Sequence, residues 1–473
     1  MIVTEKKSDF KCLERNIYEI VCQLGREVLA TLLQKLDDRL MLDRDRNKYR
    51  HKGKRPTTLK TIMGEVEYER AVYEYRGEDG KKRCVYLLDE ELGCKTVGHM
   101  SELLCERIAE AACNGSYRKT SSEISELCGQ SVSHTGAWNV VQALGASVEK
   151  EEHWAAQLAA QNKGHGQEVT KLLFEEQDGV FLNLQGKDRE KQGKSAEMKI
   201  AIAYTGAKET GDRRYNLTGK VACAKFEESA KFFRRKEGVI AAAYNVDEID
   251  MRVLNGDGAS WIKRSVTDET VHYQLDTFHR NKAVMTYVSD PEARKTIFRL
   301  LYTKDIELCL EVIEAYANST MDEKERENYL SLLTYFQNNK DGLISYKRRG
   351  LNLPTPEEDI EYRGLGAMES NVFSIIGGRM KRCRANWSIR GGNNLASLLT
   401  LKATGKLRET VSSLAYSALP EKYAEEVTTV LSAAKMPKRV GKGYNGFKDV
   451  RIPDSMPWLK EIIKLKPLSQ IRF

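Results

Sequence analysis

Residues 168–185, EVTKLLFEEQDGVFLNLQ, begin the part of the chain that decides its fold. Apolar runs rich in β-forming residues stand on both sides of an Asp178-Gly179 pair, and such a pair is typical of a tight turn. Runs of the same kind recur in EMKIAIAYTG (197–206) and NLTGKVACAKF (216–226). The pattern predicts a series of hairpin-like, antiparallel strands.

After these runs the pattern changes to an alternation of strand and helix. The alternating segments are GVIAAAYNV (238–246), MRVLNGDGA (251–259), ASWIKRSV (259–266) and VHYQLD (271–276). Three antiparallel strands followed by such an alternation is the order of an RNase H-like fold. We therefore expect an α/β protein with an RNase H-like core.

The region before this core indicates a mixture of helices and a hairpin. Residues 8–42 place apolar side chains on one helical stripe, and residues 58–93 alternate with period two around an EDGKK turn. Residues 116–145 have the layout of a helix-turn-helix. Thr120 or Ser121 would cap its first helix and Ser131 or Ser133 its second, with Trp138, Val140, Val141 and Leu144 facing inward. Any helical hairpin shares these features.

The expected organisation has six segments. They are an N-terminal helix, basic linker and β-hairpin region (1–98), a helix-turn-helix-like DNA-binding region and connector (99–166), the first part of the RNase H-like core (167–282), a helical insertion (283–360), the Glu-bearing helix of the core (361–434) and a basic C-terminal tail (435–473). The insertion is assigned because it is rich in Leu, Glu, Lys and Tyr at helical spacing.

Three acidic residues in different local contexts suit a metal site. Asp178 and Asp257 each come at or just after a β-rich run and precede Gly, so we expect both at strand ends or turns. Glu369, in LGAMESNVFSIIGGRMKRCRANW, opens a stretch with helical character. Oxygen-only ligands suit Mg²⁺ or Mn²⁺, and two such ions about 3.5–4 Å apart drive displacement at phosphorus. Asp178 is expected to be the bridging ligand on a central strand; a tight turn is the structural alternative for each Asp-Gly pair.

Other polar residues accompany this trio. Asp276 and His279, in LDTFHRNKAV, would end a strand and begin a helix. There they could orient a metal ligand or contact the DNA backbone, or Asp276 could act only as a helix cap. The cations Arg379, Lys381 and Arg382 would lie along the helix of Glu369 and hold phosphates. Trp387 would either stack on a base or fill the core.

Charge permits a nucleic-acid partner without demanding one. The 473 residues contain 76 Lys and Arg against 68 Asp and Glu, a net charge of +8. Cations cluster in residues 44–60, including Lys52, Lys54 and Arg55, and in residues 435–451, including Lys438 and Arg439; we expect phosphate contacts there or plain solvated surface. Ten cysteines without a Cys-x-x-Cys pair support neither a zinc site nor a disulfide framework. The absence of a long apolar run predicts no membrane span and a cytoplasmic protein.

The order Asp178, Asp257, Asp276-x-x-His279, insertion and Glu369 resembles the DDE transposases of the Mutator-like superfamily. More closely, NGDGASWIK, LDTFHRNKAV, AMESNV and MKRCRANWS resemble ISLre-type bacterial insertion-sequence transposases over nearly the whole chain. The resemblance implies an RNase H-like catalytic core with a helical insertion, preceded by a mixed helix and hairpin DNA-binding region. It also implies divalent metal, binding of terminal inverted repeats and strand transfer.

The expected partners are double-stranded DNA, as transposon ends and target, and a second copy of the chain, because pairing two ends requires at least a dimer. A bacterial, cytoplasmic protein, associated with the nucleoid when active, is expected. Two alternatives remain: an RNase H-like nuclease that does not join strands, and a non-catalytic helix-turn-helix DNA-binding protein.

Overall fold

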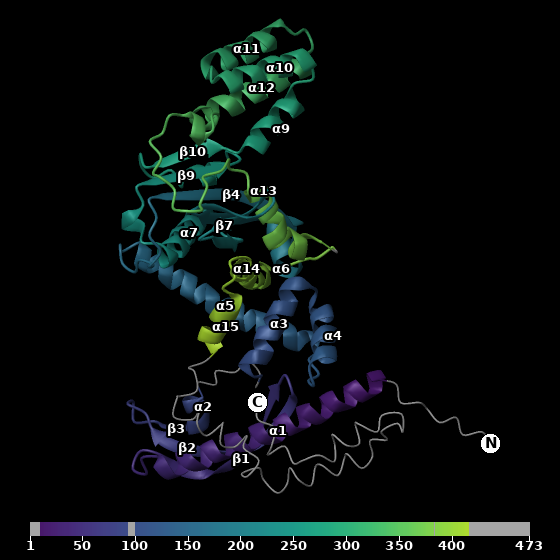
Figure 1. Cartoon of the computed structure of the whole chain (residues 1–473), viewed down its shortest axis with the longest axis vertical. Coiled ribbons are helices and arrows are strands. Elements are labelled where there is room, and N and C mark those ends of the chain that lie inside the picture. Colours follow the sequence, from purple (N-terminus) through teal and green to yellow (C-terminus); the bar gives the residue numbers. More distant parts are fainter. Residues whose placement is uncertain (1–9, 93–99, 383, 416–473) are drawn as a thin grey trace, which may run out of the picture. The chain divides into compact units, whose positions relative to one another are not determined.

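The computed structural model describes residues 10–92, 100–382 and 384–415. The chain forms two compact units, residues 1–141 with 408–473 and residues 142–407 (Figure 1). Lys438 and Arg439 lie outside the described residues. Within the described residues, no helix is both long and apolar enough to span a membrane.

The first unit combines a long helix, a three-stranded antiparallel sheet and shorter helices. Its elements are α1 (Phe10–Asp43), β1 (Arg50–Thr61), β2 (Gly64–Arg76), β3 (Lys82–Val85), α2 (Leu87–Glu91), α3 (Glu102–Asn114), α4 (Tyr117–Leu127), the start of α5 (His134–Ala159) and α15 (Leu407–Ala415). α1 is fixed to β2 by Asp37, a fully buried carboxylate that accepts a hydrogen bond from the backbone N–H of Ala71. The predicted helix and hairpin are therefore confirmed.

Three local predictions in this unit are wrong. The basic segment 44–60 is not a linker: most of it is β1, whose cations pair with acids of α1 and β2. The first helix of the hairpin is capped by Ser116, whose hydroxyl accepts from the N–H of Lys119, and not by Thr120 or Ser121. Trp138 is 44% exposed and does not face inward, whereas Val140, Val141 and Leu144 are buried as predicted.

The second unit is built on a five-stranded mixed sheet. Its strands are β4 (Leu172–Asn183), β5 (Ser195–Tyr204), β8 (Val221–Lys225), β9 (Met251–Gly256) and β10 (Val271–Leu275), in the order β10-β9-β4-β5-β8. β5 is antiparallel to both β4 and β8, while β9 runs parallel to β4 and β10 runs parallel to β9. A separate hairpin, β6 (Gly206–Gly211) and β7 (Arg214–Thr218), follows β5. The expected α/β class is confirmed.

The sequence pattern predicts two strands, one on either side of Asp178-Gly179, where the structure has the single strand β4. Asp178 and Gly179 do not form a turn between two strands; β4 continues through them, because Asp178 pairs with Ile200 and Gly179 with Lys199 of β5. A Cβ atom at position 179 would lie 2.1 Å from Oε1 of Glu197, so a larger residue here would have to displace the end of that side chain. Asp178 thus lies on the central strand, as expected, but within it.

Helices cover this sheet and extend beyond one edge of it. They are the end of α5, α6 (Gly186–Gln192), α7 (Ser229–Ala243), α8 (Ser260–Lys263), α9 (Thr277–Tyr287), α10 (Pro291–Thr303), α11 (Ile306–Ser319), α12 (Glu323–Asn338), α13 (Met368–Asn371), the π-helix η5 (Val372–Lys381) and α14 (Ile389–Ala403). The polar segment 148–166, expected as a connector, is helical up to Ala159 as part of α5. In Figure 1, α9 to α12 gather beyond the β10 edge.

The helical insertion is confirmed and has its own core. Each of its helices α10, α11 and α12 begins after an aspartate cap: Asp290, Asp305 or Asp322. Their apolar faces meet in a cluster that includes Ile297, Ile313, Leu332 and Phe336, all fully buried. The insertion is therefore a packed helical layer.

Candidate functional site

Two of the three predicted carboxylates start from neighbouring backbone positions. β4 and β9 are parallel, and their ladder ends where Gln177 faces Gly256. Asp178 and Asp257 directly follow these residues, and adjacent strands lie about 4.8 Å apart. Both side chains are half-buried. The sheet register, which the sequence pattern did not specify, therefore brings them to one place.

Two hydrogen bonds and a glycine with positive φ fix the turn that contains Asp257. Its Oδ1 accepts the N–H of Ala259 at 2.8 Å, and its backbone carbonyl accepts the hydroxyl of Tyr335 in α12 at 2.7 Å. Gly258 has a φ of +94°, a conformation that favours glycine. The expected strand-end position of Asp257 is thus confirmed, and the helical insertion contacts it directly.

Charge links Asp178 to the other predicted site residues. Burial raises the pKa of the Asp178 carboxyl; the N–H of Gly179 and the His279 ring lower it, and the charges of Asp257 and Glu369 raise it further. Glu369 lies in the first turn of α13 and is exposed. Asp257 and Glu369, from distant parts of the sequence, therefore both act electrostatically on Asp178.

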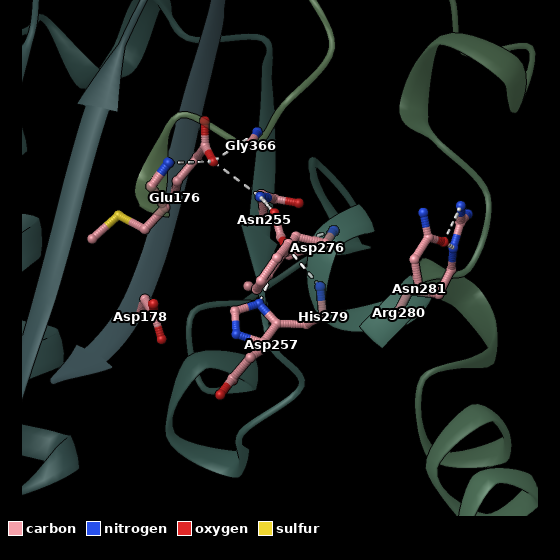
Figure 2. Close-up of polar contacts among 12 residues, drawn as sticks. Glu176, Asp178, Asn255, Asp257, Asp276, His279, Arg280, Asn281 and Gly366 are labelled. Carbon is pink, nitrogen blue, oxygen red and sulfur yellow. Dashed lines mark hydrogen bonds and ion pairs between the residues drawn. The ribbon is translucent and has the colours of Figure 1, made fainter. Parts of the chain in front are cut away.

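Asp276 and His279 form a helix cap that also faces this site. Asp276 follows β10, and its Oδ1 accepts hydrogen bonds from the backbone N–H groups of Phe278 and His279 at the start of α9. The same oxygen lies 3.2 Å from Nδ1 of the His279 ring (Figure 2). That contact raises the pKa of His279 despite its burial, and the charges of Asp178, Asp276 and Asp257 add to the effect. The acids around His279 therefore favour its protonated form.

The acidic neighbours of Asp178 on β4 have partners elsewhere. Glu175 is buried against Lys236 at 2.6 Å and Arg252 at 2.5 Å. Glu176 is also buried and accepts hydrogen bonds from several uncharged groups, among them Asn255. Neither residue competes with Asp178 for the position beside Asp257. Glu176 and Asn255 were missed as contributors to the site, although a Glu-Glu-Gln run inside an apolar strand signals buried polar contacts.

The predicted DNA-contacting residues fall into different settings. Arg379 and Lys381 lie in η5, and Arg382 follows at its end with its guanidinium 4.9 Å from the ring centre of Phe373. The stretch after Glu369 is helical, as expected, but as a π-helix, a rare form that often marks functional sites. Trp387 is 7% exposed and its Nε1–H donates to the carbonyl of Met380 at 2.9 Å, which fits the core alternative.

The N-terminal cations belong to the first unit and are partly engaged. Lys54 lies 2.6 Å from Asp38 and 3.9 Å from the buried Asp37, and Lys52 lies 3.9 Å from Glu74. Arg55 is exposed on β1. The ion pairs of Lys54 therefore help to attach β1 to α1, whatever else this strand contacts.

The donor chemistry of the site suits a hard cation. Asp178, Asp257 and Glu369 offer carboxylate oxygens, the ligand type that Mg²⁺ and Mn²⁺ prefer, and their mutual repulsion favours a bound cation. In the part of the chain that the structure describes, however, no three His, Cys, Asp or Glu side chains are already gathered closely enough to hold a metal ion. Binding would thus require side-chain movement.

Comparison with known proteins gives a family. The model of an uncharacterised protein family, UPF0236, matches residues 3–414. A UPF0236 protein of Caldanaerobacter subterraneus subsp. tengcongensis, whose name joins eleven locus designations, is 26% identical over 403 residues, covering 84% of this chain and 79% of the relative. The UPF0236 protein in vanSb 3'region of Streptococcus gallolyticus is 24% identical over 407 residues, covering 83% of each. This chain is a member of the UPF0236 family.

Proposed function

We propose that this chain is a DDE-type transposase, a metal-dependent enzyme that binds the terminal inverted repeats of an insertion sequence, cleaves DNA there and transfers the strands. The observation that carries the proposal is the relation of Asp178 to Asp257 at the end of the neighbouring strand and to Glu369, whose charge reaches it. Two of them follow paired residues of adjacent parallel strands, and the third acts on the pKa of the first. Acids that raise the pKa of a neighbouring acid in this way favour the binding of a cation.

The topology supports an RNase H-like core. Three antiparallel strands, β8, β5 and β4, are followed across the sheet by the parallel strands β9 and β10, which is the arrangement expected for such a core. The resemblance to ISLre-type transposases rests on the motifs around Asp257, Asp276, Glu369 and Trp387. The names of the relatives point the same way: one protein standing at eleven loci of one organism is what a copied element produces.

In this proposal, Asp178, Asp257 and Glu369 hold Mg²⁺ or Mn²⁺ in a two-metal site. The ions would activate a hydroxyl group and stabilise the leaving oxygen. Asp276 fixes the start of α9 and holds His279 beside the acids, where the ring can offset their charge. Arg379, Lys381 and Arg382 would contact phosphates, and the first unit, with Lys52, Lys54 and Arg55, would bind the transposon ends, assisted by Lys438 and Arg439.

The partners proposed are double-stranded DNA and a second copy of the chain, in the bacterial cytoplasm. The test incubates the purified chain and labelled duplexes from both flanks of its gene with Mg²⁺ or Mn²⁺, beside Asp257→Asn and Glu369→Gln. The proposal expects cleavage and joining by the wild type alone. Cleavage without joining would instead indicate an RNase H-like nuclease, and equal DNA binding without cleavage by all three forms would indicate a non-catalytic DNA-binding protein.

A further inference from the structure

One fully buried carboxylate, that of Glu176 on β4, collects five hydrogen bonds from three separate segments. The hydroxyl of Tyr204 donates to it at 2.6 Å and Nδ2 of Asn255 at 3.0 Å. The backbone N–H groups of residues 366, 367 and 368 donate at 3.0, 3.2 and 3.2 Å. Figure 2 shows Glu176 between Asn255 and Gly366. Burial raises the pKa of this carboxyl, and its hydrogen bonds act to lower it. All five partners are donors, which is the set that an acceptor-only carboxylate requires.

Glu176 and two of its five partners each precede a proposed metal ligand by two positions. Glu176 precedes Asp178 by two positions, Asn255 precedes Asp257 by two, and residue 367 precedes Glu369 by two. Side chains two apart on a strand point to the same face. Nδ2 of Asn255 also donates to Oδ2 of Asp276 at 2.8 Å, which extends the network to the cap of α9.

The N-terminus of α13 depends on this carboxylate. Its cap residue, Ala367, has no side chain that can accept a hydrogen bond from the first turn. The initial N–H groups of a helix lack partners within it and favour an anion. Here the anion comes from β4, about 190 positions earlier in the chain, instead of from a neighbouring Ser, Thr or Asp.

We infer that Glu176 is a positioning residue, which caps α13 across the fold and thereby holds Glu369 in register with Asp178 and Asp257. The effect of Glu176 on the reaction rests on the proposed function, whereas the capping of α13 by Glu176 does not. Glu176 itself reaches no substrate, because it is buried beneath the site. Its effect passes through the backbone of residues 366–368.

Glu175 provides a matched control. It is as buried as Glu176 and adjacent in sequence, but it points to the other face of β4 and pairs with Lys236 and Arg252. Replacing Glu175 by Gln removes a buried charge without touching residues 366–368. Replacing Glu176 by Gln brings an NH₂ group against donors and leaves one acceptor oxygen.

The experiment compares amide hydrogen exchange of the full chain in wild type, Glu176→Gln and Glu175→Gln. Exchange at residues 366–368 should rise about tenfold or more in Glu176→Gln, because the lost hydrogen bonds involve a charged group, and stay unchanged in Glu175→Gln relative to the rest of the sheet. Mn²⁺ affinity, measured by calorimetry, should fall about 10- to 100-fold in Glu176→Gln alone.

Unchanged exchange at 366–368 in Glu176→Gln, or an equal rise in Glu175→Gln, would overturn the inference. If Glu176→Gln does not fold, Glu176→Asp takes its place, since it keeps the charge but is one methylene shorter. Amide exchange at residues 366–368 should then rise by less than about tenfold. Exchange equal to that of the wild type in this variant would also overturn the inference. A wild type that neither binds Mn²⁺ nor cleaves DNA refutes the proposed function, whereas the exchange result stands apart from it.

Discussion

The acidic side chains on the two faces of β4 have neighbours of opposite charge. On one face, Glu175 meets Lys236 and Arg252, which also pair with Glu237. On the other, Asp178 meets the charges of Asp257 and Glu369, which raise its pKa beyond the effect of burial. Acids matched with cations hold the fold together, whereas acids that face acids weaken it. This difference is what the proposed cation site on the Asp178 face would require.

The largest expected effect is on DNA cleavage. Asp178→Asn, Asp257→Asn and Glu369→Gln should each lower the rate with Mg²⁺ roughly a thousandfold, because each removes a proposed metal ligand. Stability in urea should stay equal or rise, since like-charge repulsion is relieved. Glu175→Gln is the control and should cleave normally while folded. A wild-type cleavage rate in any of the three variants would contradict the assignment of that residue as a metal ligand.

The next effect is on stability at the paired face, the face of β4 on which Glu175 pairs with Lys236 and Arg252. Glu175→Gln should lower the free energy of unfolding by about 3 kcal/mol, because it leaves buried Lys236 and Arg252 short of one anion. The chain should remain folded, since typical stabilities exceed this loss. Urea denaturation at neutral pH measures it, with Asp178→Asn as the matched variant. Equal losses in both variants would mean that the two faces do not differ.

A third effect is the pH dependence of the paired face. Burial acts to raise the pKa of Glu237, but Lys236 and Arg252 override it and lower that pKa from 4.5 to about 2. A lowered carboxyl pKa stabilises the fold above pH 4.5 and loses this contribution as the pH falls toward 2. We expect about 2 kcal/mol from this group, less than the full shift because it is partly exposed. Glu237→Gln should flatten the acid limb of the stability curve; an unchanged limb would contradict the assignment.

The smallest effect is stabilisation by metal. At a Mn²⁺ concentration ten times its Kd, the wild type should gain about 1.4 kcal/mol of stability, visible as a higher Tm. Asp178→Asn should gain much less, while Glu175→Gln should gain as much as the wild type. A similar rise in all three would assign the bound ion to another place.

Features with local signals were predicted well from the sequence. The Asp-Gly pair at 257 and 258 does end a strand, Asp276 does cap α9, and the insertion is helical because its apolar spacing and aspartate caps agree. Glu369 does begin a helical stretch. Each of these depends on residues within a few positions of one another.

Features that depend on distant partners could not be predicted in this way. Whether β4 continues through Gly179 depends on its pairing with β5, and the capping of α13 depends on Glu176. The exposure of Trp138 and the extension of α5 to Ala159 likewise follow from packing and not from local pattern. Sequence motifs identified the proposed ligands, but the sheet register explains why Asp178 and Asp257 meet.

The most direct test of the shared metal site is cleavage of the chain by a bound ion. Fe²⁺ is substituted for Mg²⁺, and ascorbate with peroxide then produces radicals that cut the backbone next to the ion. The account predicts fragments that end near residues 178, 257 and 369 together, suppressed by excess Mg²⁺ and absent in Asp178→Asn. Cuts confined to other segments, or unaffected by Asp178→Asn, would contradict it.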